Sequence, residues 1–235
     1  MLILLLLSAR NVRTFHRGGE VRIPLPSPET TNVIVVVEGP SGAGKTTWCR
    51  THGGSHALLE SLPDGSIVPE DEGAAARFWV DRNVARWAEV SAREGRDGLV
   101  VVDTDPFKLH FTWSLYQIGY TTRRGWELMR DVARDAFVAG RYGLADLIYV
   151  SDVDEATLRA RRDGDPTRTR RNFERHVKLR DSTLRWYRMI DAIEPGRVVF
   201  GLPDTGIDPK LLGLGPREIR SGAVIFDRLV ASLEA

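Results

Sequence analysis

Residues 33–47 read Val33-Ile34-Val35-Val36-Val37-Glu38-Gly39-Pro40-Ser41-Gly42-Ala43-Gly44-Lys45-Thr46-Thr47. The apolar run at the start is unbroken and rich in β-branched residues, which is typical of a strand covered on both faces in a parallel sheet. The glycines after it permit backbone conformations that turn successive N–H groups inward, and a helix that starts near Gly44 adds its positive end. The stretch therefore predicts a strand, a loop that can hold a polyphosphate, and a helix. A chance glycine turn between a strand and a helix is the alternative.

The glycine-rich part satisfies the pattern G-x-x-x-x-G-K-[ST] in full. In a loop of this kind, Lys45 reaches the β and γ phosphates, Thr46 offers its hydroxyl to Mg²⁺, and Thr47 contacts the α phosphate. The stretch resembles the phosphate loop of the P-loop nucleoside triphosphatase superfamily. The expected nucleotide-binding residues are Gly39, Ser41, Gly42, Ala43, Gly44, Lys45, Thr46 and Thr47.

Apolar runs and amphipathic stretches alternate along the rest of the chain, which is typical of parallel strands joined by helices. Strands are expected over residues 33–37, 66–68, 99–102, 147–150 and 198–200, and helices over 74–94, 126–138, 172–193 and 223–233. The predicted fold is an α/β, three-layer P-loop NTPase fold, with a central, mostly parallel five-stranded sheet flanked by helices. We expect one domain over residues 32–235, preceded by an N-terminal extension over 1–31.

Composition excludes several classes of protein. The 235 residues are 42% hydrophobic and 28% charged, as in soluble globular proteins, so neither a disordered chain nor a multi-span membrane protein is expected. Lys plus Arg is 33 and Asp plus Glu is 32, so the chain as a whole has no basic field for nucleic acid. The single cysteine, Cys49, cannot form an intramolecular disulfide, so we expect a reducing compartment and place the protein in the cytoplasm.

Acidic residues follow the expected strand over 99–102. Asp103 comes directly after it, and Asp105 lies two residues further on. Ligands bind at the carboxyl ends of parallel strands, so Asp103 is expected to act in catalysis and, with Thr46, to hold the metal. Contact with the acceptor is a second role for these acids, and simple turn formation is the alternative.

A third acid, Glu70, follows the apolar residues of the expected strand over 66–68. A hydroxyl that accepts a phosphoryl group needs a nearby base to take its proton. Glu70 is placed to be that base. It is placed equally well to favour the N-terminus of the next helix, where negative charge is stabilising.

Basic residues gather between Arg159 and Arg180, where nine Lys or Arg face three acids. Gly164 and Pro166 interrupt the run, which suggests an Arg-rich lid that closes over phosphates. Arginine suits this task because its planar fork donates to two phosphate oxygens at once. Within the run, the expected catalytic residues are Arg159, Arg162 and Arg168. The alternative is a solvated, Arg-rich helix face.

The order of these parts resembles the nucleoside and nucleotide kinases among P-loop proteins, a group that includes thymidylate kinases and deoxynucleoside kinases. The resemblance covers roughly residues 33–200 and implies transfer of the γ-phosphate of ATP, with Mg²⁺, to a small acceptor. It matches Glu70 to the acid after the second strand, and Arg159 with Arg162 to the lid. The chain departs from the group because Asp103-Thr104-Asp105-Pro106 contains no arginine beside the acid. This departure makes a hydroxyl a more suitable acceptor than a monophosphate.

Aromatic residues follow the second and third expected strands, in the two regions that flank the acceptor in kinases of this layout. They could stack on a base or on another flat molecule, although aromatic residues at such spacing also build cores. The expected substrate contacts are Asp105, Phe78, Trp79, Phe111 and Trp113.

The partner that follows from these patterns is a small-molecule phosphoryl acceptor, such as a nucleoside or another hydroxylated metabolite. We expect no nucleic acid and no membrane as partner, and a homodimer is the oligomeric state to consider. The other class of function is a nucleic-acid-directed P-loop protein, either an end-phosphorylating kinase or an ATP-dependent regulator, in which the basic run follows a strand backbone. Gly164-Asp165-Pro166 within that run favours the closing lid.

Overall fold

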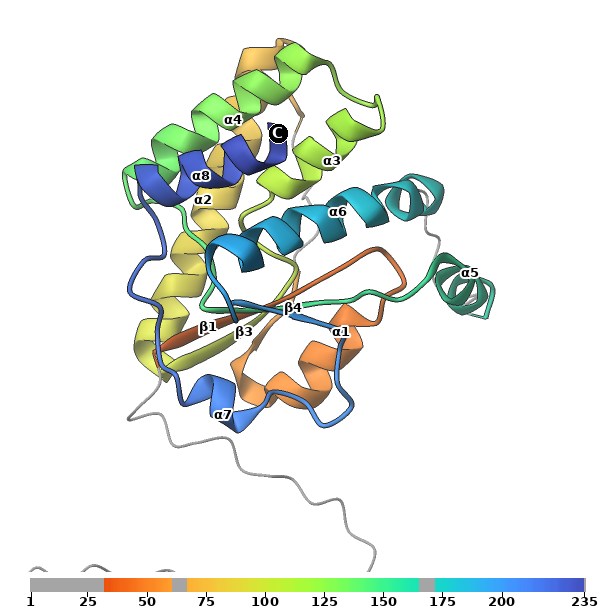
Figure 1. Cartoon of the computed structure of the whole chain (residues 1–235), viewed down its shortest axis with the longest axis vertical. Helices are drawn as coiled ribbons and strands as arrows, with labels where there is room; N and C mark the ends of the chain where they lie inside the picture. The colour runs from red at the N-terminus through yellow and green to blue at the C-terminus, as the bar shows by residue number, and fades with distance from the viewer. Residues whose placement is uncertain (1–31, 61–66, 165–171, 235) are drawn as a thin grey trace, which may run out of the picture.

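The computed structural model describes residues 32–60, 67–164 and 172–234. Its centre is a sheet of five parallel strands in the order β2-β3-β1-β4-β5 (Figure 1). The strands are β1 (Val33–Glu38), β2 (Ala57–Leu58), β3 (Leu99–Asp103), β4 (Leu147–Val150) and β5 (Val198–Phe200). This arrangement confirms the predicted α/β fold with a central parallel sheet.

Helices cover both faces of the sheet. The helices on one face are α2 (Glu72–Asp97), α3 (Leu109–Gln117), α4 (Arg123–Val138), α6 (Phe173–Ile193) and α8 (Ala223–Glu234). The short helices α1 (Lys45–Trp48) and α7 (Pro209–Leu212) lie on the opposite face, and α5 (Glu155–Asp163) lies at one end of the molecule (Figure 1). The three layers follow from this distribution.

Alternation along β1 divides the core into two parts. Ile34 and Val36 pack into the cluster under α2, α4, α6 and α8, whereas Val33, Val35 and Val37 pack into the cluster under α1 and α7. All five side chains are buried because β1 lies between β3 and β4 and is covered on both faces. Burial on both faces explains why the strand is apolar without interruption.

The helix after the phosphate loop is short. After α1 the chain makes a π-helical turn over Cys49–Gly53 and a 3₁₀ turn over Gly54–His56, and then enters β2. Gly54 has a φ of 53°, a conformation that glycine adopts without steric cost. The two adjacent glycines thus end the helix and bring the chain back to the edge of β3.

The strand expected over residues 66–68 is wrong. Ile67 and Val68 lie in irregular chain, and Ile67 is 91% exposed; Ser66 lies outside the described residues. The strand beside β3 is β2, in which Ala57 pairs with Val101 and Leu58 with Val102. Ile67 and Val68, followed by a proline, form an apolar run too short to take the place of β2 beside β3.

Residues 1–31, expected to form an N-terminal extension, lie outside the described parts of the chain. In the parts that are described, none of the helices combines the length and the apolar character that crossing a membrane requires.

Candidate active site

The phosphate loop connects β1 to α1 at the carboxyl edge of the sheet. Gly39 has a φ of 146°, and a Cβ there would lie 2.8 Å from the Cβ of Ser151, so only glycine fits. Gly44 has a φ of 93° and precedes α1, whose first hydrogen bond runs from Trp48 N to Gly44 O (2.9 Å). The Lys45 ammonium folds back over the loop and donates to Gly39 O (2.6 Å) and Pro40 O (3.2 Å).

Thr46 and Asp103 meet beside this loop. The Thr46 hydroxyl donates to Asp103 Oδ2 (2.6 Å), which joins the start of α1 to the end of β3. The second carboxylate oxygen, Asp103 Oδ1, is buried and has no hydrogen-bond partner among the described residues. Hard oxygen donors of this kind suit Mg²⁺, which usually takes few protein ligands and completes its shell with phosphate oxygens and water. The described residues contain no group of three or more His, Cys, Asp or Glu side chains that could hold a metal.

Asp105 lies behind the site. Its side chain is fully buried, and its carboxylate accepts from Phe107 N (2.8 Å) and from the Tyr187 hydroxyl (2.9 Å). Burial, with a further contribution from the nearby Glu38 carboxylate, raises the pKa of Asp105 to about 7. The structure therefore does not support the predicted contact between Asp105 and an acceptor, because the carboxylate faces the interior.

Two buried residues near the loop were not singled out from the sequence. Glu38, the last residue of β1, accepts from Gly39 N (2.7 Å) and Asp105 N (2.9 Å) and so fixes the start of the loop. His110 Nε2 lies 3.6 Å from Glu38 Oε2. Burial lowers the pKa of His110, although Glu38 opposes this, so the imidazole is neutral at pH 7. The sequence offered one signal for Glu38, because an acid at the end of an all-apolar strand, directly before the loop, is unusual enough to indicate a role.

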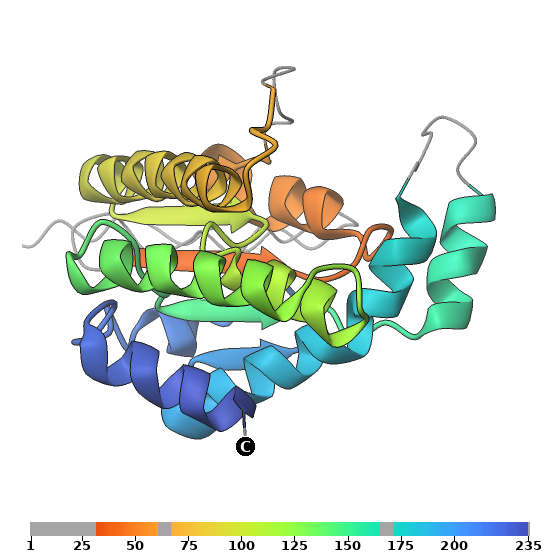
Figure 2. The same cartoon turned by 90° about the horizontal axis from the view of Figure 1, so that it is seen from above.

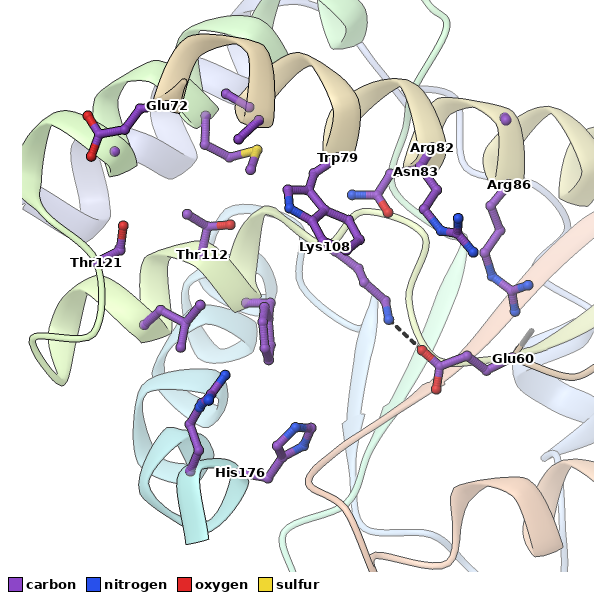
Figure 3. Close-up of a pocket in the computed structure, with 18 of the residues that line it drawn as sticks. Glu60, Glu72, Trp79, Arg82, Asn83, Arg86, Lys108, Thr112, Thr121 and His176 are labelled. Atoms are coloured by element: carbon purple, nitrogen blue, oxygen red, sulfur yellow. Dashed lines mark hydrogen bonds and ion pairs between the residues drawn. The ribbon is translucent and has the colours of Figure 1, made fainter. Parts of the chain in front are cut away.

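Glu60 occupies the position after β2 that was assigned to Glu70. Its carboxylate accepts from Lys108 Nζ (2.5 Å) and from the Thr104 hydroxyl (3.2 Å) (Figure 3). Partial burial opposes ionisation of Glu60, but Lys108, Lys45 and the Thr104 hydroxyl together outweigh it, and the pKa of Glu60 is lowered. Glu70 lies exposed in the bend before α2. The strand-end geometry that suggested a base at Glu70 therefore belongs to Glu60.

A cavity of about 730 Å³ extends from this pair between α2, α3, α4 and α6. In Figure 3 it runs from Glu60 and Lys108 at one end to Glu72 and Thr121 at the other. A smaller cavity of about 90 Å³ lies against the phosphate loop. Both cavities are lined by Glu60, Lys108, Phe111 and His176. The two spaces therefore adjoin at these residues.

The aromatic residues divide between this large cavity and the core. Trp79 and Phe111, two of the expected substrate contacts, line the cavity. Phe78 packs edge-on against Trp79 with ring centroids 5.2 Å apart, and it is not among the lining residues. Trp113 is 1% exposed and packs against Trp186, so it belongs to the core.

Polar groups from α2 and α6 converge on the cavity. Arg82, Asn83 and Arg86 point into it from α2 (Figure 3). Arg86 also donates to Leu59 O (3.3 Å) and Asp103 O (3.0 Å), and so ties α2 to the ends of β2 and β3. On α6, burial lowers the pKa of His176, which therefore presents a neutral ring.

The arginines of the basic run are distributed differently from the prediction. Arg159 and Arg162 both donate to the Glu174 carboxylate (2.8 Å each), which joins α5 to the start of α6 (Figure 2). Arg161 instead reaches the phosphate loop, where it donates to Ala43 O (3.0 Å). Arg168 lies outside the described residues. Arg161 is thus the arginine that contacts the loop. Because it lies between Arg159 and Arg162 in a run of arginines, the sequence did not single it out.

Comparison with known proteins identifies the fold. No model of a protein family matches the chain, and neither does any curated protein. Among solved structures, deoxyadenosine kinase from M. mycoides with its products dCMP and a flexible dCDP aligns with a TM-score of 0.50 at 13% identity, over 77% of this chain and 95% of the kinase. The chain has a nucleoside-kinase-like P-loop fold.

Two further structures are similar to a lesser degree. The same kinase with bound dATP has a TM-score of 0.48 at 14% identity, with the same coverage. The NadR protein in complex with NR has a TM-score of 0.44 at 19% identity, over 72% of this chain and 45% of NadR. At these identities the likeness concerns the fold, and the chemistry has to be argued from the residues of the site.

Proposed function

We propose that this protein is an ATP-dependent phosphotransferase that moves the γ-phosphoryl group of ATP to a hydroxyl of a small, nucleoside-like acceptor. One observation carries the proposal: the cavity against the phosphate loop and the large cavity share Glu60 and Lys108. A donor bound on the loop and an acceptor in the large cavity would meet at a carboxylate. Transfer between two bound molecules requires that the two reacting groups be held close together.

The donor side uses four residues. Lys45 and Arg161 now donate to carbonyls of the loop and can turn the same groups to phosphate oxygens. Thr46 and Asp103 supply the oxygens that would hold Mg²⁺ beside the nucleotide. Bound Mg²⁺ neutralises phosphate charge. The loop amides hold the donor in place while the lysine and the arginine offset charge on the transferring group.

The acceptor side uses Glu60. Its carboxylate is ionised near neutral pH, because Lys108 lowers its pKa, and it can therefore accept the proton of an acceptor hydroxyl. The hydroxyl oxygen forms a bond to the γ-phosphorus as the bond to the β–γ bridging oxygen breaks. ADP leaves, and the proton remains on Glu60.

Charge at the junction favours a hydroxyl over a phosphate as acceptor. Lys108 lines both cavities and is held by the Glu60 carboxylate, which lines both as well. A second phosphate dianion would meet the Glu60 carboxylate, whereas a neutral hydroxyl can donate to it.

The large cavity suits a flat acceptor. Its volume of about 730 Å³ lies within the range for small-molecule sites. Trp79 and Phe111 offer ring faces for stacking, and Asn83 and Arg82 offer polar contacts on the α2 side. The deoxyadenosine kinase structure holds dCMP as a product, which supports nucleosides as the first acceptors to test.

The test is a transfer assay with Mg²⁺-ATP and a panel of nucleosides and other hydroxylated metabolites, read as phosphorylated product by mass spectrometry. We expect product with at least one nucleoside-like acceptor and none with Lys45→Ala. Glu60→Gln should lower kcat about 100- to 10,000-fold, whereas its matched control Glu70→Gln should leave kcat within about threefold. ATP hydrolysis that is the same with every acceptor, and no phosphorylated product, would contradict the proposal.

The nucleic-acid alternative receives less support from the site. Arg159 and Arg162, which such a protein would direct at a strand backbone, both pair with Glu174. Strand binding that weakens steeply with salt would be the result in its favour.

A further inference from the structure

Lys108 lies in the turn between β3 and α3, at the boundary of the two cavities. Its main chain is held firmly, because Lys108 N donates to the Tyr142 hydroxyl (2.9 Å), which in turn donates to Pro106 O (2.7 Å). Tyr142 is 1% exposed. The position of Lys108 is therefore set by the core, while its side chain extends to the site.

The Lys108 ammonium has one side-chain partner in the described structure, the Glu60 carboxylate at 2.5 Å. The other cations at the junction are used differently. Lys45 donates to carbonyls of the phosphate loop, and Arg86 donates to the carbonyls of Leu59 and Asp103. Of these three cations, Lys108 is the one that pairs with the carboxylate proposed as base.

Glu60 lies two residues after β2, the shortest strand of the sheet, and its side chain is 39% exposed. A carboxylate on such a strand end has freedom to turn into solvent. Two donors limit that freedom, Lys108 on one oxygen and the Thr104 hydroxyl on the other. The pair of bonds holds the carboxylate in one orientation at the mouth of the large cavity.

We propose that Lys108 is a positioning residue for the transfer, which holds the Glu60 carboxylate ionised and oriented toward the acceptor hydroxyl. The inference rests on the proposed function. It assigns to Lys108, which lies in the turn after β3, the electrostatic task of pairing with the Glu60 carboxylate. The stretch Asp103-Thr104-Asp105-Pro106 contains no arginine that could do so.

The direction of the charge effect on Glu60 agrees with this role. Burial would raise the pKa of Glu60, and Lys108 is the largest of the groups that lower it, followed by Lys45 and the hydrogen bond from Thr104. Arg86 on α2 also points toward Glu60 (Figure 3). With the Lys108 charge removed, Lys45 and the Thr104 hydrogen bond remain to oppose burial, and Glu60 should hold its proton to higher pH.

The experiment replaces Lys108 with Met, which keeps the length and removes the charge, and with Arg, which restores the charge. Lys210→Met is the matched control, because Lys210 is an exposed lysine on α7. For Lys108→Met we expect kcat to fall about 10- to 100-fold, with the acceptor KM changed less than about threefold. The acidic limb of the pH profile of kcat/KM should move to higher pH. Lys108→Arg should recover most of the loss, and Lys210→Met should behave as wild type.

A second measurement does not depend on activity. The carboxyl carbons of ¹³C-labelled glutamate are titrated by NMR, with the Glu60 signal assigned from Glu60→Gln. We expect the pKa of Glu60 to rise in Lys108→Met and to return in Lys108→Arg. Should Lys108→Met fail to fold, Lys108→Gln takes its place, since the Lys108 side chain is 30% exposed and tolerates polar replacement.

The outcomes are distinct. An unchanged Glu60 pKa in Lys108→Met overturns the inference whether or not the protein phosphorylates any acceptor. A raised Glu60 pKa with unchanged kcat and an unmoved acidic limb also overturns it. An absence of transfer in the wild type, together with a Glu60 pKa that responds to Lys108, contradicts the proposed function and leaves the electrostatic pairing established.

Discussion

Replacing Asp105 with Asn should make the protein less sensitive to alkaline pH. Asp105 is fully buried, and its pKa is raised from 3.8 to about 7, chiefly by burial and then by Glu38. An acid whose pKa is higher in the folded state stabilises the fold below its unfolded pKa, and this contribution is lost as pH rises through the folded pKa. Asparagine can keep the hydrogen bond from Phe107 N, and the Tyr187 hydroxyl can rotate to accept from the new amide.

The size of the effect follows from the two pKa values. Between about pH 5 and about pH 8, a shift from 3.8 to about 7 removes about 2.5 kcal/mol from the free energy of unfolding of the wild type. His110, whose pKa is lowered by burial, has the opposite pH dependence, and it is present in both proteins, so it cancels in their difference.

Urea unfolding, followed by tryptophan fluorescence at both pH values, measures this difference. Asp105→Asn should gain about 2.5 kcal/mol relative to the wild type on going from the lower to the higher pH. Its acceptor KM should stay within about threefold, because Asp105 does not line either cavity. An equal stability difference at the two pH values would refute the reasoning, since the carboxylate would then ionise as readily in the fold as in the unfolded chain.

Four further expectations concern single side chains. Thr46→Ala should raise the Mg²⁺ concentration needed for half-maximal ATP binding about 10-fold or more, measured by calorimetry, since Asp103 loses its partner. Arg161→Ala should lower kcat about 100-fold or more, whereas Arg159→Ala should affect it far less; equal losses would contradict the placement of Arg161 at the loop. Trp113→Ala should cost about 3–5 kcal/mol in urea unfolding, because the ring is buried in the core. Trp79→Ala should instead raise the acceptor KM about 10-fold, measured from initial rates, and an unchanged KM would remove Trp79 from the acceptor site.

Much of the fold could be predicted because the pattern that specifies it is local. The strands over 147–150 and 198–200 match β4 and β5, because each is apolar without a break, although β5 is an edge strand and its Phe200 is exposed. Ala57 and Leu58 gave no such signal, since β2 owes its existence to pairing with β3 rather than to its own composition. Helix α5 was not among the expected helices, because Leu158 is its one buried residue and most of its other residues are charged or alanine.

The residues of the candidate site also divide into those that local sequence patterns predicted and those that only the structure reveals. Lys45, Thr46 and Asp103 follow from a motif and from the end of a strongly apolar strand, and the structure brings them together. Glu60 could be found only once the register of β2 was known. Asp105 should face the same way as Asp103 if the strand continued with a period of two. Thr104, with a φ of 73°, breaks that period, and no pattern in the sequence indicates it.

The close approach of Gly39 to Ser151 has a consequence for how fast a nucleotide can bind. The loop backbone is wedged against the end of β4 and is fastened by the Glu38 carboxylate, so its amides already hold one shape. In the proposed function, nucleotide binding would then require Lys45 and Arg161 to release carbonyl oxygens of the loop and to donate to phosphate oxygens instead. Because little conformational entropy remains to be lost in the main chain, association should be limited by diffusion and side-chain rearrangement rather than by folding of the loop.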